Sequence, residues 1–136
     1  MAQAMKVVAD THAAIWYLWD PSRLSAAGLA ALDDSLSSGE EVGVSAITLC
    51  EIVYLAEKGR LPSDALDLFL KALEAPAPAF EVVPLDLSVA SRLGEVPRDV
   101  VPDMPDRIIA ATALARGVPL ITRDQRLRQS GVPTIW

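Results

Sequence analysis

The sequence predicts an α/β fold, a layered domain in which helices cover both faces of a central parallel sheet. Short segments rich in β-branched residues alternate with helical segments along the 136 residues. Helical connections of about ten residues or more join parallel strands through right-handed crossovers. An apolar fraction of 51% provides a core at this length. The chain is therefore expected to be one domain over residues 1–136.

Helix caps and helix breaks divide the first half of the chain. Pro21 disfavours helix in the residue before it and so ends the first helix. Ser25 caps the helix that follows, and Gly39 ends that helix. Ser45 lies at the end of the second strand and begins the third helix. The expected elements are strands 5–10 and 41–46 and helices 11–19, 26–38 and 47–59.

The second half of the chain continues the alternation. Leu66, Phe69 and Leu73 recur at helical spacing. Asp86 begins a shorter helix, and Gly117 ends the last long one. The expected elements are strands 80–83, 118–122 and 132–136 and helices 64–75, 86–93 and 103–116.

Four acidic residues fall at strand ends or in the helices that follow strands. Asp10 ends the first strand, Asp124 follows the fourth, and Asp106 lies in the first turn of the last long helix. Glu51 lies in an apolar helix, where a buried carboxylate needs a cationic partner. Ligands of open parallel sheets bind outside the carboxyl ends of the strands, so these acids are candidate site residues.

Most of these acids also have a purely structural interpretation. Asp10 and Asp103 suit the N-caps of the helices that follow them, and the helix dipole favours Asp106 in the first turn. Asp124 suits a turn. Only Glu51 lacks such a role, because helix formation does not require a glutamate on that apolar segment.

Taken together, the acids indicate a cation site. Carboxylates that converge at one sheet edge repel one another and raise each other's pKa. Mg²⁺ or Mn²⁺ prefers oxygen ligands and can activate a water for phosphoryl transfer. Thr122, two residues before Asp124, adds a hydroxyl that can orient a water or a phosphate.

Other chemistries have little support in the sequence. His12 is the single histidine, which excludes a multi-histidine zinc site, although a catalytic role for it stays open. Cys50 is expected in the core because its helix is apolar and no second cysteine exists. Neither a nucleophile elbow nor a glycine-rich phosphate loop occurs. Trp16 and Trp19 are expected in the core or at a partner interface.

Net charge and composition predict a cytoplasmic protein with no membrane segment. The formal charge of −6 argues against a large surface that binds nucleic acid non-specifically. Residues 103–136 nevertheless hold five arginines and three aspartates, so a local positively charged surface can lie beside the acids. The single cysteine fits a reducing compartment, and neither a membrane-spanning stretch nor a signal peptide is recognisable.

Several motifs resemble those of the PIN domain, specifically of the VapC-type toxins of bacterial toxin–antitoxin pairs. They are VVADTHAAIWYL, VSAITLCEI, PDRIIAATALARGVPLITRDQRL and the closing IW. The motifs are short, but their order and spacing are specific and cover nearly the whole chain. The resemblance implies a doubly wound parallel sheet of four to five strands. It also implies an Mg²⁺- or Mn²⁺-dependent endoribonuclease that cleaves RNA with a metal-activated water.

The same resemblance implies roles for individual residues. It places the metal-binding and catalytic acids at Asp10, Glu51, Asp106 and Asp124. Thr122 matches a polar position near the metal, and Asp103 matches an extra acid whose role is less defined.

The resemblance further implies an RNA substrate, a small VapB-like antitoxin and a homodimer, with Trp16 and Trp19 as possible contacts. The helices at 47–58 and 62–74 provide a possible antitoxin groove, because their apolar stripes can exceed what the core uses. The alternative is that the core buries every one of their apolar side chains, which are Ile52, Val53, Leu55, Leu66, Phe69, Leu70 and Leu73.

Two other classes of protein stay open. A metal-dependent phosphatase or phospho-acceptor domain also begins with a strand that ends in Asp. A dehalogenase-like phosphatase, however, needs a second acid at the position of His12, and a receiver domain needs a late lysine, whereas none follows Lys71. The other class is a binding module without catalysis.

Overall fold

The computed structural model of the chain describes residues 4–136, so the first three residues of the predicted domain lie outside the described part. No helix in this part is long and apolar enough to cross a membrane. The strands are β1 (Met5–Ala9), β2 (Glu41–Ser45), β3 (Phe80–Val83), β4 (Leu120–Ile121) and β5 (Thr134–Ile135). The α-helices are α1 (Thr11–Trp19), α2 (Ala26–Ser37), α3 (Ala46–Glu57), α4 (Ala65–Glu74), α5 (Leu87–Ala90), α6 (Met104–Arg116) and α7 (Gln125–Arg128).

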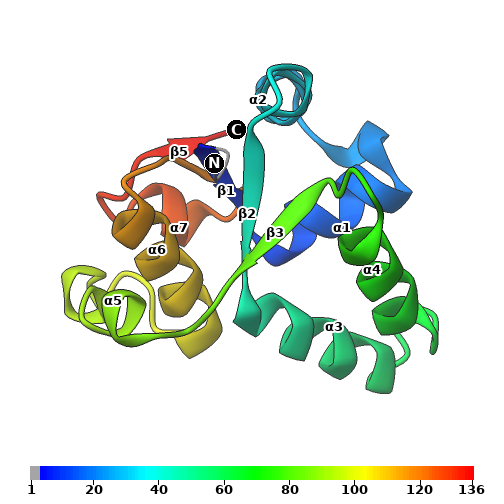
Figure 1. Cartoon of the computed structure of the whole chain (residues 1–136). Coiled ribbons are helices and arrows are strands. Elements are labelled where there is room, and N and C mark those ends of the chain that lie inside the picture. Colours follow the sequence, from blue (N-terminus) through cyan, green and yellow to red (C-terminus); the bar gives the residue numbers. More distant parts are fainter. Residues whose placement is uncertain (1–3) are drawn as a thin grey trace.

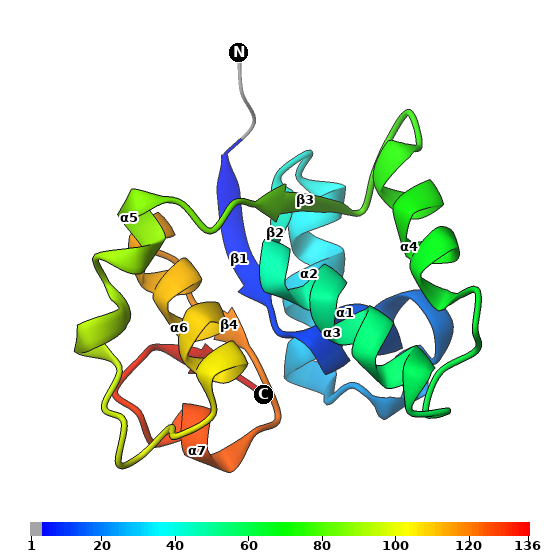
Figure 2. The ribbon, with the colours of Figure 1, turned by 90° about the horizontal axis from the view of Figure 1, so that it is seen from below.

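The five strands form one parallel sheet in the order β3-β2-β1-β4-β5. Helices α5 and α6 lie on one side of it, and α1 and α4 lie on the other (Figures 1 and 2). The predicted fold class is therefore confirmed. The strand order reverses beside β1, because the chain adds β2 and β3 on one side of it and β4 and β5 on the other.

Successive residues of β1 supply the cores on the two faces of the sheet. Val7 and Ala9 are buried in the cluster formed with α1, α2 and α4. Val8 is buried in the opposite cluster, against Ile109 and Ala113 of α6. A central strand must be apolar on both faces, which explains why β1 is a continuous apolar run.

Several elements differ from the sequence prediction. Helix α5 ends at Ala90, well before the predicted end at residue 93, and a 3-10 turn over Leu93–Glu95 follows. Strand β4 keeps only two residues of the predicted 118–122. Helix α7 and a 3-10 turn over Pro21–Arg23 were not predicted, because segments of three or four residues are too short for periodicity.

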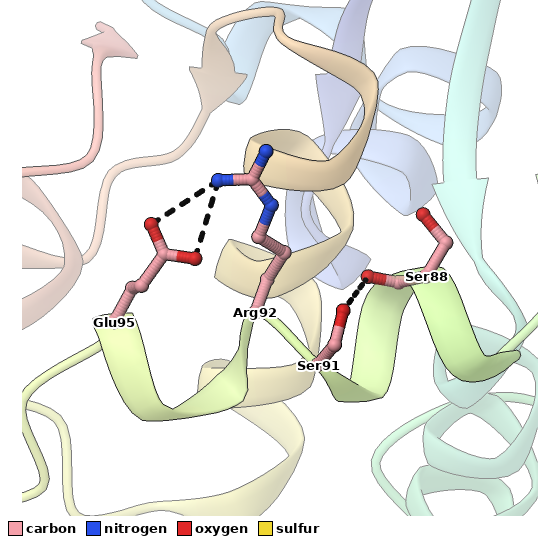
Figure 3. Close-up of polar contacts among 4 residues, drawn as sticks. All are labelled: Ser88, Ser91, Arg92 and Glu95. Atoms are coloured by element: carbon pink, nitrogen blue, oxygen red, sulfur yellow. Dashed lines mark hydrogen bonds and ion pairs between the residues drawn. The ribbon is translucent and has the colours of Figure 1, made fainter.

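Side-chain contacts hold the region around the end of α5. The Ser91 hydroxyl donates to the carbonyl oxygen of Ser88 at 3.0 Å. The Arg92 guanidinium contacts both carboxylate oxygens of Glu95 at 3.2 Å (Figure 3). These contacts lie on the exposed surface of the segment that follows α5, and α5 itself packs against α6.

The prediction that Cys50 belongs to the core is wrong, because its side chain is exposed. Helix α3 turns Thr48 and Ile52 inward, whereas Val53 and Tyr54 remain 36% and 56% exposed. Apolar residues therefore occupy the outer face of α3 as well as the inner one. Sequence periodicity cannot separate the faces of a helix that is apolar all round.

Candidate active site

All four predicted acids line one cavity of about 620 Å³ at the carboxyl edge of the sheet. The cavity lies where β1 and β4 end side by side, beside the reversal of the strand order. Open α/β sheets bind ligands at such a point, because the connections leave it in opposite directions and open a crevice. The topology thus joins Asp10 and Glu51 with Asp106 and Asp124 from the far end of the chain.

Asp10 both caps α1 and faces the cavity. One carboxylate oxygen accepts from the Ala13 amide at 2.8 Å, so the predicted N-cap is confirmed. The other oxygen accepts from the Thr122 hydroxyl at 2.5 Å. The side chain is only 8% exposed, and burial raises its pKa despite these two donors. The two hydrogen bonds fix the direction in which Asp10 presents its charge.

Glu51 is held by hydroxyl groups rather than by a cation. The Thr11 hydroxyl donates to Glu51 Oε1 at 2.5 Å, and the Thr48 hydroxyl lies 3.0 Å from that of Thr11. Because Thr11 donates its proton to Glu51, Thr48 donates to Thr11 in turn. Burial is the main cause that raises the pKa of Glu51.

Thr11 and Thr48 are site residues that the sequence analysis missed. Their only sequence signals are that Thr11 follows Asp10 and that Thr48 lies one helical turn before Glu51.

Asp106 lies in the first turn of α6, next to the helix cap. The Asp103 carboxylate accepts from the Asp106 amide at 3.1 Å, so the predicted cap is confirmed. Within residues 4–136, the Asp106 carboxylate itself accepts no hydrogen bond. Burial, followed by repulsion from Asp103 and Asp124, raises its pKa to about 7. Asp106 is therefore an acid whose charge still needs a partner.

Asp124 begins α7 and is tied to Asp10 through one threonine. Its carboxylate accepts from the Leu127 amide at 3.0 Å, so its local role is the N-cap of α7 rather than the turn expected from the sequence. Its own amide donates to the Thr122 hydroxyl oxygen at 3.0 Å. Thr122 therefore accepts from Asp124 and donates to Asp10, and this fixes the relative position of the two acids.

Aromatic and basic side chains line the same cavity as the acids. His12, Trp16, Arg123 and Arg126 line it together with the acids. Trp16 is only 9% exposed and belongs to the core, which was one of its two expected places, so its part in a dimer contact stays a prediction. Trp19 is 41% exposed and remains available.

The donors around the cavity suit a hard divalent cation. The acids offer only oxygen ligands, and the ion pairs found within residues 4–136 involve none of them. In the same range, however, no three acidic, histidine or cysteine side chains are grouped closely enough to hold one ion as placed. Mg²⁺ is commonly bound by one or two carboxylates and keeps several waters, so the site fits an ion whose remaining ligands are waters.

Residues 7–132 match the family model of the PIN domain. The chain belongs to the PIN-domain family. It is also 35% identical over 133 residues to ribonuclease VapC22 from Mycobacterium tuberculosis, covering 96% of this chain and 98% of that protein. The predicted assignment to PIN domains of the VapC type, a nuclease family, is confirmed.

Solved structures share the fold. A chain in the crystal structure of VapBC2 from Rickettsia felis, bound to promoter DNA, superposes with a TM-score of 0.70 at 14% identity, covering 96% of each chain. A chain of a toxin–antitoxin complex from Klebsiella pneumoniae gives 0.65 at 22% identity, covering 96% of this chain and 97% of that one. FitAcB from Neisseria gonorrhoeae gives 0.60 at 25% identity, with coverage of 94% and 95%.

Proposed function

We propose that this PIN domain is an Mg²⁺- or Mn²⁺-dependent endoribonuclease that acts as the toxin of a toxin–antitoxin pair in the cytoplasm. The observation that carries the proposal is the cavity in which Asp10, Glu51, Asp106 and Asp124 meet without a cationic partner. Burying several carboxylates together is costly, and a divalent cation offsets that cost. The 35% identical relative carries the name of a ribonuclease, which supports RNA as the substrate.

Each residue has a distinct part in this proposal. A divalent ion would be held by carboxylates from among the four acids, and it would supply an activated water and neutralise phosphoryl charge. Asp10 is already rigid, and Asp106 has free carboxylate oxygens directed to the cavity. Thr122 keeps Asp10 in place, and Asp103 holds the start of the helix that carries Asp106.

The nuclease proposal is tested by replacing one acid without changing its size. Asp106→Asn should abolish cleavage of a labelled RNA at saturating Mn²⁺ because the neutral amide no longer balances the ion's charge. Glu57→Gln makes the same charge change at the exposed end of α3 and should leave cleavage unaltered. Undiminished cleavage by the unmutated chain in EDTA would refute the metal-dependent mechanism.

The outer surface of α3 and α4 provides a binding groove for an antitoxin helix. Val53, Ala56, Leu66 and their neighbours line a groove of about 310 Å³ there. The core does not use every apolar side chain of the two helices, since Ile52 and Phe69 are fully buried while Val53 is 36% exposed. Amphipathic helices bind in such grooves through apolar contacts. A homodimer, with Trp19 among its contacts, is part of the same proposal.

A further inference from the structure

Two guanidinium groups and two aromatic rings surround the indole of Trp16 at the edge of the acidic cavity. The Arg23 guanidinium carbon lies 4.8 Å from the ring centroid, and that of Arg123 lies 5.8 Å away. The His12 ring is 5.5 Å from it, and the Trp136 ring is 6.1 Å from it. Because the Trp16 side chain is almost fully buried among them, it cannot offer a free face to a nucleic-acid base.

The two arginines next to Trp16 are not neutralised by the acids nearby. In the described part of the chain, no carboxylate lies within ion-pair distance of Arg23, Arg123 or Arg126. This holds although Arg123 is adjacent to Asp124 in the chain and lines the same cavity. A guanidinium stacked on an aromatic ring uses its flat face and leaves its in-plane N–H donors free.

Free guanidinium donors next to a carboxylate cavity are suited to phosphate. Arginine binds phosphate oxygens through two parallel hydrogen bonds, and stacking on an indole orients that fork in advance. The acids repel phosphate unless a cation lies between them. The arginines that line the cavity are therefore the groups there that attract the phosphates next to the one in the cavity.

From this arrangement we infer that Arg123 and Arg126, with Arg23 held on Trp16, bind the backbone phosphates of single-stranded RNA that flank the phosphate in the cavity. The inference rests on the proposed nuclease function and names the surface that holds its substrate. Trp16 is a positioning residue that orients guanidinium groups rather than stacking on a base. Because the arginines would contact phosphates and not bases, the affinity of this surface for RNA should not depend on base sequence.

The salt dependence of RNA binding tests this assignment. All variants are made in the Asp106→Asn background so that the RNA stays intact, and a fluorescently labelled single-stranded RNA is titrated at several KCl concentrations. Arg123→Gln and Arg126→Gln should each weaken binding several-fold at low salt. Each should also reduce the slope of log affinity against log salt by about 0.7, the value for one lost contact to a single strand.

Arg116→Gln is the matched control, because it removes one exposed positive charge at the far end of α6. Ten residues of helix place Arg116 about 15 Å from Asp106 along the axis. Its slope should equal that of the parent. Equal losses in all three variants would mean that only net charge matters, and this would overturn the assignment.

A conservative variant tests the guanidinium of Arg123, whose carbon lies 5.8 Å from the centroid of the Trp16 ring. Arg123→Lys keeps the charge but lacks the planar fork, so it should retain most of the salt slope and still lose affinity. If it binds as tightly as the parent, the role of Trp16 as an orienting surface is refuted. If the unmutated chain binds RNA through these arginines but never cleaves it with Mn²⁺, the nuclease proposal is refuted. The assignment of the arginines to RNA binding would then still hold.

Discussion

At Asp106, the negative charge that the proposed metal site needs lowers the stability of the metal-free protein. The pKa of Asp106 is raised to about 7, first by burial and then by Asp103 and the other acids. Between the pKa of the unfolded chain, near 4, and about 7, the folded state therefore holds a proton that the unfolded state has lost. The metal-free protein should be most stable at the acid end of this window and should lose stability as the pH rises through 7.

This pH dependence can be measured by denaturant unfolding in EDTA at a series of pH values from 5 to about 8.5. Asp106→Asn should flatten the profile and raise the melting temperature above pH 7, by roughly 4 °C for each kcal/mol gained. Glu57→Gln should reproduce the parent's profile. A variant Asp106→Asn that is as pH-dependent as the parent would show that other groups cause the effect.

A bound cation should change the sign of this effect. Metal binding needs the deprotonated carboxylate, so Mg²⁺ should stabilise the parent more at pH 8 than at pH 5.5. Asp106→Asn should lose most of this stabilisation.

At the residue scale, the sequence predicted the acids well and their partners poorly. Asp10 and Asp124 were recognised because a strand end is visible in the sequence. Thr48 was missed because its contact with Thr11 joins residues 37 positions apart, and no local pattern reports it. The cationic surroundings of Trp16 were missed for the same reason, since Arg123 reaches it only in the folded chain.

Among the elements, α6 shows how one helix start serves two purposes. Asp103 caps it by accepting the Asp106 amide, yet the same carboxylate raises the pKa of Asp106. Asparagine caps helices as well as aspartate does and carries no charge, whereas alanine cannot cap. Asp103→Ala should cost about 1 kcal/mol of unfolding free energy. Asp103→Asn should be nearly neutral.

The two variants separate capping from charge. NMR titration of the Asp106 carboxyl in Asp103→Asn should give a lower pKa than in the parent. If Asp103→Asn destabilises the protein as much as Asp103→Ala does, the cap is not the role of Asp103. In that case a charge-dependent role has to be sought.

Helices with caps were predicted closely, whereas the length of a strand was not always predicted. Helix α1 has the bounds expected from sequence, because Asp10 caps its start and Asp20-Pro21 ends it. Strand β4 is shorter than expected because only Leu120 and Ile121 pair with Val8 and Ala9 of β1. The length of a strand therefore depends on how many residues of the neighbouring strand pair with it, and the sequence of one segment alone does not carry that information.

On the scale of the whole molecule, two surfaces differ in the chemistry of their side chains. The carboxyl edge gathers the acids and the arginines, whereas the outer side of α3 and α4 exposes apolar residues. Val53 lies two residues from Glu51 on the same helix, but its side chain is exposed and lines the groove. A partner bound in that groove would contact the helix that carries Glu51, one of the proposed active-site acids.

The last prediction concerns the partner in that groove. Co-expression with the small protein encoded next to this chain should yield a complex and relieve growth arrest. Val53→Asp should lower the amount of co-purified partner, because burying a carboxylate among apolar side chains is costly. RNA cleavage by the isolated variant should stay at the parent's level. Leu87→Asp places the same charge at an 84% exposed leucine on α5 and should change neither property.

Two results would contradict this picture at different levels. If Val53→Asp co-purifies as well as the parent does, the partner binds elsewhere on the surface. If the neighbouring protein neither co-purifies with the unmutated chain nor relieves its growth arrest, the toxin assignment fails even where RNA cleavage is observed. In the proposed function, the nuclease chemistry depends only on the carboxyl edge of the sheet, whereas inhibition by a partner requires the additional apolar surface of α3 and α4.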